Sequence, residues 1–258
     1  MNVLQKIIEN KRTEIAGMSC DSSGLERSKR SFFDAISKND EQELPNFITE
    51  IKKVSPAKGA IFQEVDVVRL AKIYEVNGAA TISVLTDKKF FGGNVEDLKN
   101  VSENVSVPVL RKGFILDKSQ IYEARKAGAD AVLLMTQVLS EDEIREFLLI
   151  CYDLGMDALV EVFDENNLET AVRAGAKIIG VNSRDFNAPD LKLDRGNFAK
   201  ILPQIPKGIV RVALSGVSNV DQVREVAPMC DAVLVGTSLM QLRDYKKIGE
   251  KVREFCGK

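Results

Sequence analysis

The segment AGADAVLLM at residues 127–135 is the stretch that most directly predicts the fold. It follows an amphipathic segment of helical length at residues 118–126, and Gly128 lies where a helix commonly ends in a left-handed residue. The chain then continues as an apolar run, residues 131–135, without alternation of polar side chains. Such continuous apolar strands are typical of parallel sheets covered by helices on both faces. The segment is therefore interpreted as a helix-to-strand junction of an α/β protein.

The same junction recurs along the chain. NGA at residues 77–79 and AGA at 174–176 also separate an amphipathic segment from an apolar run, and LGMD at 154–157 is a looser copy. The predicted strands are residues 47–51, 80–85, 107–110, 131–135, 158–162, 177–181, 209–214 and 232–235. The predicted helices that follow them are residues 65–76, 95–103, 118–126, 141–154, 165–173, 195–202, 220–226 and 239–255.

Eight strand–helix units in 258 residues predict a closed (β/α)8 barrel, also called a TIM barrel. A doubly wound open sheet is the competing architecture, but it more often shows a glycine-rich fingerprint after its first strand, where this chain has EIKK at 50–53. Two further helical patterns, residues 3–16 and 25–38, precede the first strand. We expect one domain over residues 1–258, with a helical extension at 1–45 and the barrel at 46–258.

Composition narrows the function to small-molecule chemistry. The chain has 36 Lys and Arg against 38 Asp and Glu, so no basic excess draws it to nucleic acid or to an acidic membrane. It contains no histidine, which excludes a histidine base and any His-ligated metal. Its four cysteines lack C-x-x-C spacing, and it has neither a signal-peptide core nor an apolar run of membrane-spanning length. We expect a cytoplasmic enzyme with reduced thiols.

Polar residues gather at the predicted C-terminal ends of strands, where barrels of this kind carry their chemistry. The first strand carries Glu50 and Lys52 on one face, because side chains two residues apart share a strand face. The third ends in Lys112, the fifth carries Glu161 within an apolar run, and the sixth leads into Asn182. A buried unpaired carboxylate costs several kcal/mol, which makes Glu161 the strongest functional candidate. For the other residues the alternative is that they have no function and are merely solvated at the strand ends.

The last two strands end in LSGV at 214–217 and VGTS at 235–238. In such barrels these loops commonly hold a phosphate on backbone N–H groups, and glycine lets the backbone approach. The alternative is that the glycines only shape tight turns. Arg184, which follows the sixth strand, is either part of the same anion site or a salt-bridge partner on the rim. Lys53 and Arg111 are expected to face the helix layer.

Taken together, these motifs resemble the indole-3-glycerol phosphate synthase family. ITEIKKVSPAKG at 48–59 looks like its signature, and the resemblance covers residues 1–242. The other matching motifs are SVLTD at 83–87, FFGG at 90–93, VLRK at 109–112, LVEV at 159–162, GVNSRD at 180–185 and VLVGTSLM at 233–240. The resemblance implies a (β/α)8 barrel with an N-terminal helical extension. It also implies a carboxy-lyase of tryptophan biosynthesis that converts 1-(2-carboxyphenylamino)-1-deoxyribulose 5-phosphate into indole-3-glycerol phosphate, carbon dioxide and water.

The resemblance also implies roles for the polar residues. Lys112 would be the acid that polarises the sugar carbonyl, Glu161 and Glu50 would move protons and hold the anilino group, and Asn182 would hydrogen-bond the reacting centre. Lys52 would meet the substrate's carboxylate and belong to its anion site as well. The phosphate-binding residues would be Lys52, Arg184, Ser215, Gly216, Gly236, Thr237 and Ser238. No cofactor or metal is implied, and the expected partner is the phosphorylated small molecule, with association with other enzymes of the pathway left open.

The chain departs from the family's pattern at three positions. Gly113 stands where the family usually has Asp, Leu214 where it has Glu, and Phe163 where it has His. Because a neighbouring carboxylate favours a protonated lysine, Gly113 predicts a lower pKa for Lys112 than in its relatives. Restoring the acids at 113 and 214 is therefore expected to improve the enzyme.

Two alternative functions follow from these comparisons of motifs. A barrel that is catalytically impaired and only binds a phosphorylated ligand or a partner subunit is favoured by the two missing acids. Phosphoribosylanthranilate isomerase is also a phosphate-binding barrel, but its chemistry calls for a Cys at the end of the first strand, where this chain has Glu-Ile-Lys.

Overall fold

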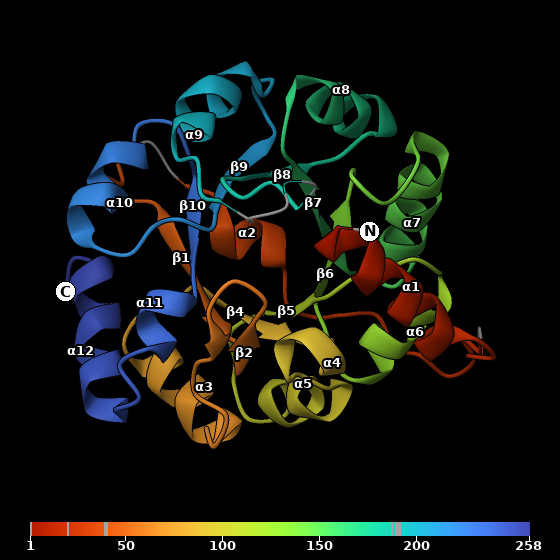
Figure 1. The fold of residues 1–258 in the computed structure, drawn as a ribbon, viewed down its shortest axis with the longest axis horizontal. Coiled ribbons are helices and arrows are strands. Elements are labelled where there is room, and N and C mark those ends of the chain that lie inside the picture. Colours follow the sequence, from red (N-terminus) through yellow and green to blue (C-terminus); the bar gives the residue numbers. More distant parts are fainter. Residues whose placement is uncertain (1, 20, 39–40, 187, 189–191) are drawn as a thin grey trace.

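A computed structural model describes residues 2–19, 21–38, 41–186, 188 and 192–258 of the chain. Its eight main strands close into a barrel in the order β1-β10-β9-β8-β7-β6-β5-β4, and helices surround this barrel (Figure 1). The strands are β1 (Asn46–Ile51), β4 (Thr81–Leu85), β5 (Val109–Lys112), β6 (Ala131–Met135), β7 (Asp157–Val162), β8 (Ile178–Asn182), β9 (Val210–Leu214) and β10 (Ala232–Val235). Each pairs in parallel with its neighbours in the chain, and β10 pairs with β1. The predicted barrel is confirmed, and the competing architecture, a doubly wound open sheet, is excluded.

The helices of the outer layer begin where a polar side chain caps the first turn. Asp66, Ser140 and Asp164, for example, each accept the backbone N–H three residues later, a typical N-cap contact. These helices are α3 (Val67–Val76), α5 (Val95–Ser102), α6 (Ser119–Lys126), α7 (Glu141–Asp153), α8 (Glu165–Ala174), α9 (Gly196–Ile201), α10 (Val220–Val226) and α12 (Tyr245–Phe255). Shorter elements are α4 (Lys88–Phe91), α11 (Thr237–Met240), the 3-10 turn η1 (Leu202–Gln204) and the hairpin of β2 (Val54–Ser55) with β3 (Gly59–Ala60).

Two predicted helices differ from the structure. The pattern at residues 239–255 predicted one helix, but α11 ends at Met240 and α12 begins at Tyr245, with Arg243 between them at a φ of 50°. The pattern at residues 25–38 forms only α2 (Phe32–Ile36). The part that stays irregular contains Arg30, whose Nε lies 2.8 Å from a carboxylate oxygen of Asp130 at the start of β6. A long-range ion pair therefore takes precedence over local helical propensity there.

The N-terminal extension touches both ends of the barrel. Helix α2 lies across the centre of the ring of strands in Figure 1, and the N–H of Phe33 donates to Asp157 at the start of β7. Helix α1 (Val3–Ile15) reaches the opposite end, because its Lys11 pairs with Asp87, which lies two residues beyond the end of β4. We call that end, where the strands have their C-termini, the mouth of the barrel.

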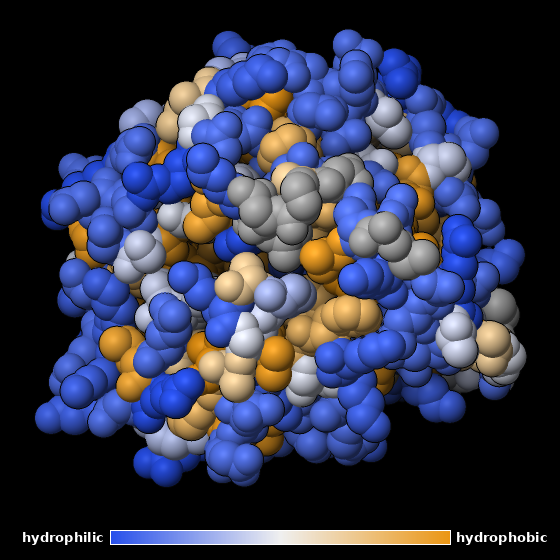
Figure 2. Space-filling view, viewed as in Figure 1, coloured by the Kyte–Doolittle hydropathy of each residue, from blue (hydrophilic) through white to orange (hydrophobic). Residues whose placement is uncertain are grey.

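One face of the molecule is mostly polar (Figure 2), and the described cysteines are free thiols. The face in Figure 2 is largely hydrophilic, with hydrophobic residues exposed near its centre. Among the described helices, none combines the length and the apolar character needed to cross a membrane. Cys151, Cys230 and Cys256 are free thiols, and burial raises the pKa of Cys151 to about 12. Cys20 lies outside the described residues.

Candidate active site

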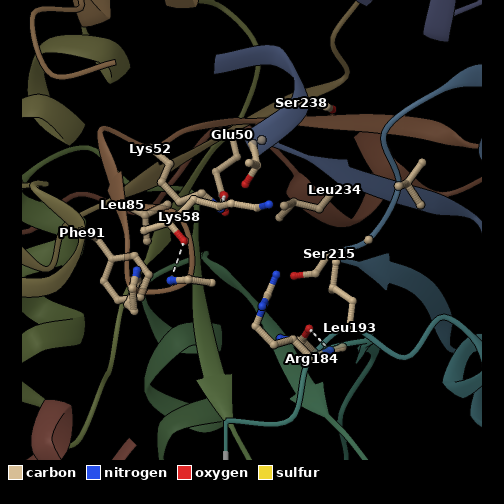
Figure 3. Close-up of a pocket in the computed structure, with 18 of the residues that line it drawn as sticks. Glu50, Lys52, Lys58, Leu85, Phe91, Arg184, Leu193, Ser215, Leu234 and Ser238 are labelled. Atoms are coloured by element: carbon tan, nitrogen blue, oxygen red, sulfur yellow. Dashed lines mark hydrogen bonds and ion pairs between the residues drawn. The ribbon is translucent and has the colours of Figure 1, made fainter. Parts of the chain in front are cut away.

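A cavity of about 300 Å³ opens at the mouth of the barrel. Figure 3 shows Glu50 on one side of this cavity and Arg184 and Ser215 on the opposite side. Its lining includes all but one of the predicted site residues: Glu50, Lys52, Lys112, Asn182, Arg184, Ser215, Gly216, Gly236, Thr237 and Ser238. The remaining one, Glu161, lines a small adjoining recess that also contains Lys112. The strand ends thus bring the whole predicted set together.

Glu50 lies between the two lysines. Its carboxylate is 2.6 Å from Nζ of Lys52 and 3.6 Å from Nζ of Lys112, and only 1% of the residue is exposed. Burial by itself favours the neutral acid, but the positive charges of both lysines outweigh it, so the pKa of Glu50 lies below its ordinary value. Glu50 is therefore an ionised group that holds two ammonium groups at the mouth.

Glu161 has the opposite electrostatic character. Burial raises its pKa above the ordinary value, and the nearby charge of Lys112 and a hydrogen bond from Asn182 offset this only in part. Nδ2 of Asn182 donates to Oε1 of Glu161 at 2.9 Å, while Oε2 is buried without a hydrogen-bond partner among the described residues. A carboxyl group with a raised pKa suits proton donation.

Asn182 is itself held from two directions. Its Oδ1 accepts the N–H of Arg184, and its backbone carbonyl accepts Nδ2 of Asn197 at 3.0 Å. Asn197, near the start of α9, also donates to the carbonyl of Phe163 just after β7. The Asn197 side chain thus fixes the ends of β7 and β8 relative to each other. Asn197 was not predicted as a site residue, because in the sequence it is a single Asn within a predicted helix.

Lys112 keeps its positive charge in the cavity. Burial disfavours the ammonium form, but the carboxylates of Glu50, Glu161 and Asp87 outweigh it, so the pKa of Lys112 lies above its ordinary value. The expectation from Gly113, a lower pKa for Lys112 than in its relatives, stays a prediction, because the raised pKa is relative to an ordinary lysine. The structure shows that Asp87, from the end of the adjacent strand, places another carboxylate close enough to favour the ammonium.

An apolar recess adjoins the two catalytic candidates and was not predicted. It is lined by Leu85, Phe91, Phe114, Leu133, Met135 and Phe186 around Lys112 and Glu161. The rings of Phe91 and Phe114 are 6.3 Å apart between centroids, and Phe186 meets Phe114 edge-on at 6.0 Å. These spacings are typical of aromatic pairs. The recess holds only about 20 Å³, too little for a planar ring, but Leu85, Phe91 and Phe186 line it and the larger cavity alike. Phe91 lies within a quoted motif, and Phe114 and Phe186 lie close to others, but only closure of the barrel brings the three rings together.

The opposite part of the cavity is suited to an anion. Ser215 and Gly216 adopt left-handed backbone conformations after β9, with φ of 67° and 81°, and Oγ of Ser238 is buried without a hydrogen-bond partner among the described residues. Lys52 and Arg184 line the same cavity. Gly236 has a second role, because a Cβ there would lie 2.5 Å from Oε1 of Glu50.

Two charged neighbours of the site face outward, as predicted. Lys53 pairs with Asp97 on α5 at 2.7 Å, and Arg111 pairs with Glu123 on α6 at 2.7 Å. Within the part of the chain that the structure describes, no group of three His, Cys, Asp or Glu side chains could hold a metal ion.

Comparison with solved structures agrees with the fold. The thiamine phosphate pyrophosphorylase from Pyrococcus furiosus superposes with a TM-score of 0.60 at 18% identity, covering 85% of this chain and 98% of that one. A tryptophan synthase structure from M. tuberculosis gives 0.63 at 13% identity, covering 90% and 98%. At such low identity these similarities establish the barrel alone.

Sequence relatives are much closer. The indole-3-glycerol phosphate synthase 1 of Streptomyces coelicolor is 42% identical over 251 residues, which cover 95% of this chain and 93% of that protein. The indole-3-glycerol phosphate synthase of Chlorobium phaeovibrioides is 38% identical over 257 residues, covering 96% and 98%. The sequence model of the indole-3-glycerol phosphate synthase family matches residues 4–253. With this match and these full-length relatives, the chain belongs to the indole-3-glycerol phosphate synthase family.

Proposed function

We propose that the residues at the mouth carry out the family's reaction: closure of the indole ring of 1-(2-carboxyphenylamino)-1-deoxyribulose 5-phosphate, with loss of carbon dioxide and water. One observation supports this most. The anion-binding end, the lysines with their carboxylates and the aromatic recess are continuous, since Lys112 and Phe91 line both the cavity and the recess. The substrate has the same three parts: a phosphate, a reactive sugar carbonyl and an aromatic ring.

Binding follows from that correspondence. The phosphate lies at Ser215, Gly216, Gly236, Thr237 and Ser238, with Arg184 nearby. The ring lies in the cavity against Leu85, Phe91 and Phe186, the wall that the cavity shares with the recess. Lys52 lines the larger cavity and not the recess, so it meets the substrate's anionic groups from the side of Glu50. Its ion pair with Glu50 can be exchanged for one with the incoming carboxylate.

Ring closure needs an acid at the sugar carbonyl. Lys112 protonates the carbonyl oxygen while the ring carbon that bears the carboxylate attacks the carbonyl carbon, so a carbon–carbon bond forms as the C=O π bond breaks. The carboxylate then leaves as carbon dioxide, and its bonding electrons restore the aromatic ring. The raised pKa of Lys112 keeps the ammonium form available for the first step.

Dehydration completes the indole. The new hydroxyl leaves as water with a proton from Glu161, whose raised pKa favours the acid form. The neighbouring methylene carbon gives up a proton to ionised Glu50, and the electron pair of that C–H bond forms the second double bond of the five-membered ring. Asn182 orients Glu161 throughout, through the 2.9 Å hydrogen bond.

A turnover assay tests this function. Adding the carboxyphenylamino-deoxyribulose phosphate to the purified chain should produce indole fluorescence, and inorganic phosphate should inhibit competitively. The second candidate, a barrel that binds a phosphorylated ligand without turning it over, is favoured by buried Leu214 in place of the family's Glu. It predicts saturable binding of the substrate with no fluorescence and no carbon dioxide.

We also propose a cytoplasmic location and, for its partners, enzymes of tryptophan biosynthesis that pass on or receive phosphorylated intermediates. Fractionation of cells that express a tagged chain tests the location. Cross-linking in the same cells tests the association, which would be contradicted by recovery of the chain without other enzymes of the pathway.

A further inference from the structure

A buried ion pair joins the N-terminal helix to the mouth of the barrel. Nζ of Lys11 on α1 lies 2.7 Å from Oδ1 of Asp87 and 2.5 Å from Oε2 of Glu14. Lys11 is 7% exposed and Asp87 is 3% exposed. Lys11 is the one residue of α1 that is both charged and buried among the described residues of that helix. The pair connects residues 76 positions apart in the chain, which the sequence did not reveal.

The second oxygen of Asp87 belongs to the recess. Oδ2 accepts the backbone N–H of Phe114 at 3.2 Å, and the Phe114 ring lines the recess two residues after Lys112. A Cβ at Gly113 would lie 2.9 Å from the same Oδ2. Glycine at this position therefore leaves room for the carboxylate of Asp87 to reach the segment between the acid and the aromatic wall.

Stability alone does not account for such a pair. A buried ion pair loses much of its attraction to desolvation, and apolar side chains of similar volume often stabilise a protein equally well. Leu4 and Ile7 on the same helix already pack into the barrel's inner apolar cluster, which includes Phe91 and Phe114. The charged pair adds something that apolar packing lacks, a fixed direction for the Asp87 carboxylate.

We propose that Lys11 is a positioning residue for ring closure: by holding Asp87, it fixes the Phe114 segment and keeps the aromatic recess in shape beside Lys112. The proposal rests on the proposed function, since it assumes that the substrate's ring lies against the aromatic wall that the recess shares with the cavity. Lys11 touches no part of the reacting centre, and it acts through Asp87. Glu14 is the other carboxylate that faces it, and Lys112 is the cation whose charge Asp87 also meets.

Lys11→Met tests the proposal, because methionine keeps much of the length and removes the charge. Lys6→Met is the matched control, since Lys6 is exposed on the same helix. We expect Lys11→Met to raise KM for the substrate about tenfold, because a displaced Phe114 segment binds the ring less well without touching the reacting groups. The inhibition constant of inorganic phosphate should stay within about twofold of the parent's, because the anion end lies away from Lys11. In Lys11→Arg, which keeps the positive charge, KM should return most of the way to the parent's value.

A second variant separates positioning from folding. Asp87→Asn removes the charge that Lys11 neutralises, so the double variant Lys11→Met, Asp87→Asn leaves no unpaired buried carboxylate and should fold even where Lys11→Met alone does not. If Lys11 acts through Asp87, the double variant has the KM of Asp87→Asn alone. The proposal is overturned if KM is higher in the double variant than in Asp87→Asn alone. It is also overturned if the inhibition constant of inorganic phosphate rises in parallel with KM.

The outcomes also separate this proposal from the proposed function. If the parent and Lys6→Met both form the indole product and Lys11→Met does so with unchanged KM, only the role of Lys11 is wrong. If the parent binds the substrate but forms no product, the proposed function fails, and the role of Lys11 in ring closure fails with it.

Discussion

Nδ2 of Asn182 lies 2.9 Å from Oε1 of Glu161, and this hydrogen bond joins the ends of two adjacent strands, β8 and β7. It satisfies one carboxyl oxygen and leaves Oε2 buried without a hydrogen-bond partner in the described part of the chain. An unsatisfied buried oxygen is costly in a resting protein, and substrate binding would give it a partner. The pair therefore supports the proposal that Glu161 meets the substrate.

The first prediction concerns the carboxyl group itself. Glu161→Gln retains the hydrogen bond to Asn182 but can neither release nor accept the proton, so kcat should fall roughly 10²-fold or more. KM should change much less, because the shape of the recess is kept. Steady-state kinetics with the natural substrate decides this, and a kcat within a few-fold of the parent's would remove Glu161 from proton transfer.

Lys112 allows a sharper comparison of two variants. Lys112→Ala should lower kcat by roughly 10²-fold or more, the usual scale for a positioned acid. Lys112→Arg should not restore it, because a guanidinium keeps its proton near neutral pH and has a different shape. Substrate binding measured by equilibrium dialysis should survive in the arginine variant. A normal rate in that variant would show that position 112 supplies charge alone.

The pH profile tests the link between Lys112 and Glu50. The pKa of Lys112 lies above its ordinary value, so the lysine stays protonated until the pH rises through that value. Glu50→Gln removes the nearest carboxylate, lowers this pKa and should move the alkaline limb of kcat/KM to lower pH. Glu250→Gln, on the exposed side of α12, is the control and should leave the limb in place. An unmoved limb in Glu50→Gln would assign it to another group.

Much of this site could be predicted from sequence because strand ends are visible as local patterns. Glu50, Lys112 and Glu161 stand at the ends of apolar runs or inside them, and a closed parallel barrel brings all such ends to one rim. Lys53 and Arg111 were predicted to face the helix layer, and their pairs with α5 and α6 confirm it.

What the sequence did not show depends on long-range contacts. The pairing of Lys11 with Asp87 and the edge-on contact of Phe186 with Phe114 join distant segments. Neither has a spacing or composition that marks it. Arg30 likewise looked like part of a helix until the barrel placed Asp130 beside it. Local periodicity gives the elements, while their contacts follow only from closure of the barrel.

The packing around Gly113 favours a loss, and not the expected gain, for Gly113→Asp. A Cβ there would lie 2.9 Å from both Oδ2 of Asp87 and Oγ1 of Thr86, and an added carboxylate would face the charge of Asp87. Gly113→Asp should therefore lower the melting temperature and raise KM. The free energy of unfolding should fall by about 1–3 kcal/mol, as is usual for overpacking. Thermal unfolding and kinetics check this together. Gly208→Ala is a control for the lost glycine, since nothing lies within 4 Å of its added Cβ, although its φ of 87° adds some strain of its own.

Leu214 is the departure where restoring an acid should help. It is the register partner of Asn182 in β9, and its side chain is 1% exposed in the barrel's inner cluster beside Gly180. Leu214→Glu would bring a second carboxyl group to the strand next to Asn182. Two such groups close together share a proton readily, because each raises the pKa of the other. We expect kcat above the parent's and a lower melting temperature, since the added group is buried.

Leu214→Gln separates charge from polarity in this last experiment. Glutamine has the same shape as glutamate and can accept and donate hydrogen bonds, but it cannot exchange a proton. If the gain comes from proton transfer, Leu214→Glu turns over faster than Leu214→Gln across the pH range in which the acid titrates. Equal rates would mean that the position contributes only polarity. If both variants are slower than the parent, the apolar side chain belongs to a working arrangement in which Glu50 and Glu161 suffice for the two proton transfers.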